Sequence, residues 1–99
     1  MFARLTRFQG KIDKADEAIE LFKNSIIPAA KSQKGFCGIY FFIDRKTGSG
    51  VSIAFWDSEE DAIANEKSGY YQEQLVKFMD FLATPSYIRE GYDVVVQAD

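Results

Sequence analysis

Residues 36–56 read FCGIYFFIDRKTGSGVSIAFW, and this stretch decides the fold. Its first part, Phe36–Ile43, is almost continuously apolar, which is typical of a strand that is covered on both faces. The polar, glycine-containing turn Arg45–Gly50 links it to a second apolar run, Val51–Trp56. The stretch therefore predicts two antiparallel strands in the middle of the chain.

Before this hairpin, the sequence predicts one strand and one helix. The strand is Phe2–Phe8, which is short and rich in β-forming residues. Apolar residues then recur at helical spacing from Ala15 to Ile26, and Gly35 follows as a helix stop. Pro28 lacks a backbone N–H, so we expect a kink near the end of this helix.

After the hairpin, the sequence predicts two helical runs and a last strand. The first run begins at Asp57 or Ser58, either of which can cap it, and the second begins at Tyr70. Thr84–Ser86 ends the second run, and Tyr92–Ala98 is the predicted last strand. The order β-α-β-β-α-β predicts an α+β fold of ferredoxin-like topology, with a four-stranded antiparallel sheet and the helices on one side.

The composition favours one self-associating domain, residues 1–99. Hydrophobic residues make up 46% of the chain and aromatic residues 15%, which is a heavy apolar load for so small an interior. The net charge of −3 lacks the basic stripe that nucleic-acid binding needs, and no apolar run is long enough to cross a membrane. With one cysteine and no apparent signal peptide, we expect a cytoplasmic protein.

The chain contains no histidine. Histidine is the most common general base and metal ligand near neutral pH. Its absence argues against serine or cysteine triads, zinc sites and a histidine-ligated haem. We therefore expect neither a metal nor a cofactor.

Strand parity divides the predicted sheet into two faces, because side chains alternate along a strand. We assign the more aliphatic set to the side under the helices: Ala3, Leu5, Cys37, Ile39, Phe41, Ile43, Val51, Ile53, Phe55, Tyr92, Val94 and Val96. The other set mixes aromatic with polar side chains: Phe2, Arg4, Thr6, Phe8, Phe36, Tyr40, Phe42, Ser52, Ala54, Trp56, Asp93, Val95 and Gln97. Such a mixture is typical of a small-molecule site, and we expect a second copy of the chain to cover it.

Several of these residues also have a purely structural interpretation. Trp56 fits a packing anchor as well as a ligand contact. Arg4 and Asp93 are expected on neighbouring strands, where they form either a structural ion pair or a ligand anchor. The Tyr40 hydroxyl can donate to a ligand or to a backbone carbonyl.

The chain resembles the dimeric α/β-barrel superfamily and, within it, proteins like the antibiotic biosynthesis monooxygenases. Three segments carry the resemblance: Ile27-Pro28, Gly35-Phe36-Cys37-Gly38, and Phe55-Trp56-Asp57-Ser58-Glu59-Glu60-Asp61-Ala62. The resemblance implies a homodimer that joins its sheets face to face and has a pocket between the sheet and helices of each protomer. It also implies oxidation of quinol-like aromatic substrates by molecular oxygen, with no metal or flavin.

The resemblance and the parity argument together give a candidate site. The catalytic candidates are Trp56, Asn65 and Arg4, and the substrate-binding candidates are Tyr40, Phe42, Thr6, Ser52, Tyr70 and Asp93. Many relatives carry histidine at the positions of Asn65 and Tyr70, which is a departure from the family's pattern.

Two other functions are weighed against oxidation. A non-catalytic protein that binds or senses a small apolar or aromatic ligand fits the missing histidines. Single-stranded RNA binding shares the topology, but Ser49 and Val51 stand where the RNA-recognition module needs aromatic rings.

Overall fold

The computed structural model describes residues 1–99, and its strands form one antiparallel sheet in the order β2-β3-β1-β4. The strands are β1 (Phe2–Gly10), β2 (Phe36–Ile43), β3 (Ser49–Trp56) and β4 (Leu82–Asp93). The helices are α1 (Ala15–Leu21), α2 (Ile27–Lys31), α3 (Glu59–Glu66) and α4 (Gly69–Met79), with a 3-10 turn at Ile12–Lys14 and a π-helical segment at Phe22–Ile26. The predicted α+β ferredoxin-like fold is confirmed.

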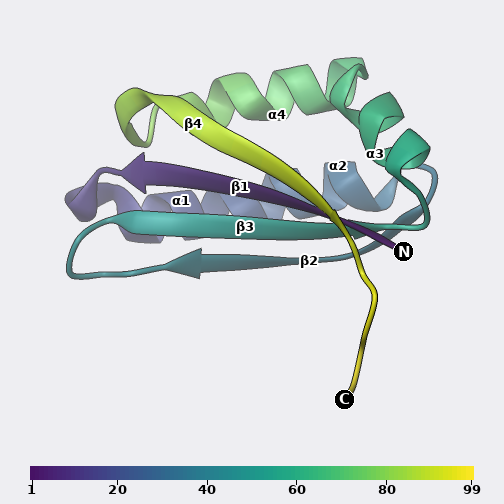
Figure 1. Cartoon of the computed structure of the whole chain (residues 1–99). Coiled ribbons are helices and arrows are strands. Elements are labelled where there is room, and N and C mark those ends of the chain that lie inside the picture. Colours follow the sequence, from purple (N-terminus) through teal and green to yellow (C-terminus); the bar gives the residue numbers. More distant parts are fainter.

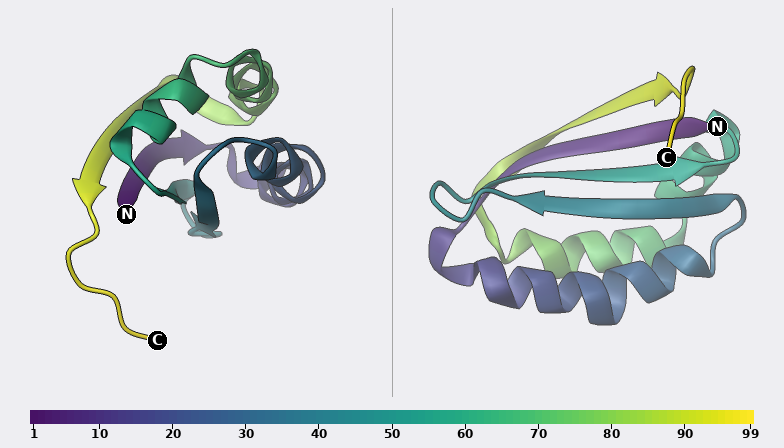
Figure 2. Two further views of the ribbon diagram at one scale, coloured as in Figure 1. Left: turned by 90° about the vertical axis from the view of Figure 1, so that its right-hand side faces the viewer. Right: turned by 90° about the horizontal axis from the view of Figure 1, so that it is seen from below.

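All the helices lie on one side of the sheet and leave its other face open (Figures 1 and 2). We call these two sides the helix-covered face and the outer face. None of the helices is both long enough and apolar enough to cross a membrane.

The segment from α1 to α2 is a single helical rod with a widened turn in its middle (Figure 2). The N–H of Ile27 bonds to the carbonyl of Phe22, five residues earlier, in the π-helical manner. Pro28 follows and has no N–H to offer to the preceding turn. The kink was predicted for the last turn of the helix, whereas that turn lies in the α-helical α2 and the irregular segment comes before it. Gly35 then reverses the chain with φ of 82°.

The second pair of helices, α3 and α4, begins at Ser58, whose side chain accepts a hydrogen bond from the backbone N–H of Asp61. Ser58 is therefore the cap, one of the two predicted candidates. Ser68 caps α4 in the same way, through the N–H of Tyr71.

The last strand was predicted wrongly. It is Leu82–Asp93 and not Tyr92–Ala98, and the residues after Asp93 form an irregular tail (Figure 1). Thr84–Ser86, which we expected to break the structure, lies inside this strand. Because β4 is at the edge of the sheet, Pro85 is tolerated there despite its missing N–H.

The assignment of sheet faces was also wrong for most strands. Arg4, Thr6, Ser52 and Trp56 face the helices, whereas the aliphatic set expected there lies on the outer face for β1 and β3. In β2, Ile39 and Phe41 face the helices as predicted, while Phe36 joins them.

A β-bulge explains the mixed outcome in β2. Phe36 pairs with Trp56 and Gly38 pairs with Phe55, so Cys37 is an extra residue that shifts the alternation. Cys37 is exposed, not buried under the helices as the parity argument placed it.

Candidate functional site

A cavity of about 130 Å³ lies between the helix-covered face and the helices. Its floor is made of small side chains, because Thr6 and Ser52 stand opposite each other in β1 and β3 and Ala54 comes next along β3. Ala29 and Ala30 of α2 are equally small on the other side. Because the side chains on the sheet and on α2 are both small here, they do not fill the space between the sheet and the helix.

Aromatic clusters close the two ends of this space. At one end Phe22 stacks on Phe41 with 4.1 Å between ring centroids, and Phe78 meets Phe8 edge to face at 5.0 Å. At the other end Trp56 is only 2% exposed and packs against Phe2 and Ala62. The cavity is thus a gap in an otherwise continuous apolar core.

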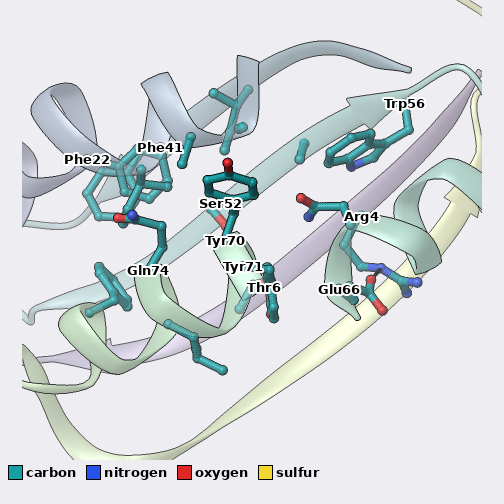
Figure 3. Close-up of a pocket in the computed structure, with 18 of the residues that line it drawn as sticks. Arg4, Thr6, Phe22, Phe41, Ser52, Trp56, Glu66, Tyr70, Tyr71 and Gln74 are labelled. Atoms are coloured by element: carbon teal, nitrogen blue, oxygen red, sulfur yellow. Dashed lines mark ion pairs between the residues drawn. The ribbon is translucent and has the colours of Figure 1, made fainter. Parts of the chain in front are cut away.

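The lining side chains come from the sheet and from the helices (Figure 3). The complete lining is Arg4, Thr6, Phe8, Phe22, Ile26, Ala29, Ala30, Ile39, Phe41, Ser52, Ala54, Trp56, Asn65, Glu66, Tyr70, Tyr71, Gln74, Leu75 and Phe78.

The charged part of the lining is an ion pair between Arg4 of β1 and Glu66 of α3. Nε of Arg4 lies 2.5 Å from Oε1 of Glu66, and the two side chains are 19% and 16% exposed. The contact is an ion pair by distance, but neither atom has a hydrogen-bond partner of good geometry, and both are buried. The Arg4 guanidinium also lies over the ring of Phe2, 5.2 Å from its centroid.

Tyr70 and Tyr71 enter the site from the start of α4. Tyr70 is 59% exposed. The Tyr71 hydroxyl accepts a hydrogen bond from Arg89 of β4. Burial raises the pKa of the Tyr71 phenol above its ordinary value of 10.0, and the positive charge of Arg89 opposes this shift.

Gln74 of α4 contacts the π-helical segment beside the cavity. Its Oε1 accepts a hydrogen bond of 2.7 Å from the hydroxyl of Ser25. Lys77 donates to the same Ser25 oxygen at 3.1 Å. These polar contacts hold α4 against the π-helical segment.

The structure brings together most of the predicted site residues. Arg4, Thr6, Ser52, Trp56, Asn65 and Tyr70 all line the cavity. The cavity lies under the helices, where the resemblance implied a pocket, and not on the face to which the parity argument assigned it.

Three of the predicted residues lie elsewhere. Tyr40 and Phe42 lie on the outer face, where they are 62% and 50% exposed. Their rings stack there with 6.1 Å between the centroids. Asp93 is at the end of β4, opposite Phe2. Arg4 and Asp93 lie on neighbouring strands as expected, but Arg4 stands opposite Gly91 and forms its ion pair with Glu66 and not with Asp93.

Sequence reasoning missed Glu66, Tyr71 and Gln74. Glu66 had a usable signal, because it lies four residues after Ala62 and so on the same helix face as that buried alanine. Tyr71 and Gln74 are three residues apart on α4 and follow the same rule. No group of three or more His, Cys, Asp or Glu side chains lies close enough together to hold a metal ion.

Comparison with known proteins gives a consistent result. A family model described as antibiotic biosynthesis monooxygenase matches residues 1–74. An uncharacterised protein of Mycobacterium tuberculosis, Rv2557, is 36% identical over 55 residues, which are 56% of this chain and only 25% of that protein.

Solved structures share the fold at low sequence identity. SnoaB, a cofactor-independent oxygenase from Streptomyces nogalater, has a TM-score of 0.77 at 14% identity, covering 97% of this chain and 94% of its own. A conserved protein from Methanosarcina mazei Go1 has a TM-score of 0.78 at 16% identity, covering 92% of this chain and 89% of its own.

Proposed function

The chain belongs to the antibiotic biosynthesis monooxygenase family, and from this premise we propose that it binds a small quinol-like aromatic molecule and oxidises it with molecular oxygen, without a cofactor. The observation that carries the proposal is the apolar cavity with a few polar groups, since such a lining is typical of small-molecule sites.

The size of the cavity favours a single aromatic ring. Its volume of about 130 Å³ is close to the roughly 150 Å³ of an engineered apolar cavity that binds benzene. Trp56 and Ala54 offer apolar contact, while Thr6, Ser52 and Asn65 offer hydrogen bonds to hydroxyl groups. A hydroquinone is a suitable test substrate because it is one ring with two hydroxyls.

For this oxidation the protein needs only to bind the ring and to stabilise the anion that forms on it. In a monooxygenation one oxygen atom of O2 is added to the ring and the other leaves as water, and the ring itself supplies all four electrons, so that hydroquinone and O2 yield hydroxyquinone and water. Loss of a hydroxyl proton makes the ring a much better electron donor, and hydrogen bonds donated by Thr6, Ser52 or Asn65 can stabilise the negative charge that develops on oxygen.

We also propose that the protein works as a homodimer through the outer face of its sheet. Tyr40, Phe42, Ile88 and Tyr92 are each at least half exposed, and the helices leave this face uncovered (Figure 2). An exposed apolar patch of this kind is typical of an interface. In this arrangement each copy keeps its own cavity on the opposite, helix-covered face.

Oxygen uptake by the purified protein with a panel of hydroquinones tests the oxidation. We expect uptake faster than with boiled protein, with formation of hydroxyquinone and without accumulation of hydrogen peroxide. Ser52→Leu fills the floor of the cavity and should abolish it, whereas Ser49→Leu, at an exposed position of the same strand, should not. Uptake no faster than the boiled control would refute oxidation of these substrates.

A second function is favoured by one specific observation, the complete absence of histidine. A protein that binds or senses a small aromatic ligand needs no general base. Native mass spectrometry of freshly purified protein would show a co-purified ligand in this case. An empty protein that consumes oxygen would decide for catalysis.

A further inference from the structure

The ionisable side chains that line the cavity give it no net charge. The charged ones are Arg4 and Glu66, one of each sign. The charge of Arg4 is therefore balanced by Glu66 alone. In a site that binds anions, the Glu66 carboxylate would repel the ligand.

The pair is largely shielded from water. With side chains 19% and 16% exposed, Arg4 and Glu66 have little solvent to satisfy them and depend on each other. The guanidinium also lies over the ring of Phe2. A third charge in the cavity would lack a partner, and leaving a buried charge unpaired is costly.

We infer that the Arg4–Glu66 pair determines ligand charge, so that the cavity accepts a neutral single-ring aromatic molecule and rejects rings that carry a carboxylate or an ammonium group. Glu66 is the specificity-determining residue, because it cancels the attraction that Arg4 alone would exert on anions. The inference rests on the proposed function, since it takes the cavity to be the ligand site.

Three probes of similar size and different charge test this inference: benzoate, benzyl alcohol and benzylammonium. Trp56 lines the cavity and is the only tryptophan of the chain, so quenching of its fluorescence reports binding there. The unmodified protein should bind benzyl alcohol about tenfold or more tightly than either ion, which corresponds to about 1.4 kcal/mol.

Single substitutions should then redirect this preference. Glu66→Gln leaves Arg4 unbalanced and should favour benzoate, while Arg4→Gln leaves Glu66 unbalanced and should favour benzylammonium. The double variant Arg4→Gln with Glu66→Gln has no charged side chain in the cavity lining and should prefer neither ion. It also serves if a single variant does not fold, since it leaves no buried charge unpaired.

The outcomes separate this inference from the proposed function. An exchange of preference between the two single variants supports it. Equal binding of the three probes by the unmodified protein overturns it, while oxygen uptake with hydroquinone still stands or falls separately. If no variant binds any probe, the inference is overturned, and oxygen uptake with hydroquinone alone decides the proposed function.

Discussion

Phe36 and Trp56 meet edge to face across β2 and β3, with 5.5 Å between their ring centroids and 75° between their planes. They also form a register pair, and the next pair, Gly38 with Phe55, skips Cys37. The bulge at Cys37 therefore lets Phe36 reach the helix-covered face beside Trp56. This contact builds the aromatic wall that ends the cavity.

Trp56→Ala should destabilise the fold strongly, because Trp56 is 2% exposed and packs in this wall. We expect a loss of about 3–5 kcal/mol in the free energy of unfolding, measured by urea denaturation. Val76→Ala, at a residue of α4 that is 68% exposed, is the control and should change little. A loss below about 1 kcal/mol for Trp56→Ala would contradict the packing described.

Gly35→Ala should also be destabilising. Gly35 has φ of 82°, and an added methyl group would lie 2.8 Å from Cβ of Asp61. The strained backbone alone costs about 1–3 kcal/mol in a residue other than glycine. Gly38→Ala is the matched control, since a methyl group there meets nothing within 4 Å. Equal thermal melting temperatures for the two variants would contradict this prediction.

The fold was predictable from the sequence because its signals are local. An apolar run, a glycine-containing turn and a second apolar run specify β2 and β3 by themselves. The faces of the sheet were not predictable, because both sets of side chains in β1 and β3 are apolar enough to be covered. The bulge at Cys37 has no sequence signal of its own, and it reverses the alternation in β2.

Tyr40→Lys should weaken the proposed dimer. Tyr40 is 62% exposed on the outer face, and burying a lysine charge there against a second sheet would cost free energy. Sedimentation at micromolar concentration should show a dimer for the unmodified protein and a folded monomer for the variant. Val76→Lys, on α4, should remain dimeric. A monomer in every case would refute the proposed interface.

Alkaline pH should destabilise the protein partly through Tyr71. Burial raises the pKa of this phenol in the folded state above 10.0. The resulting stabilisation is fully present below the unfolded pKa and is lost as the pH rises through the folded pKa. Tyr71→Phe should therefore lose less stability than the unmodified protein between pH 9 and about 12.

The control for Tyr71 is Tyr92→Phe. The pKa of Tyr92 is also raised, by its hydrogen bond to Glu90, but Tyr92 is on the exposed outer face. In a single chain its contribution is weakened by water, so at dilutions where the protein is monomeric this variant should follow the unmodified protein more closely. Urea denaturation at several pH values makes the comparison, and identical curves for Tyr71→Phe and the unmodified protein would contradict it.

The site was predictable only in part. Trp56, Asn65 and Tyr70 could be named because the resemblance covers the passage from β3 into α4. Glu66 could not be connected with Arg4, since their contact depends on how α3 crosses β1 and not on any spacing in the sequence. Tyr40 and Phe42 lie on the face away from the helices, as the parity argument placed them, and the error was to expect the site on that face.

The most direct test is a crystal structure of the protein with hydroquinone. The account predicts one ring in the cavity, in contact with Trp56 and above Thr6 and Ser52, in each copy of a dimer joined by Tyr40 and Phe42. A ring held on the outer face, or an empty cavity at saturating hydroquinone, would contradict it.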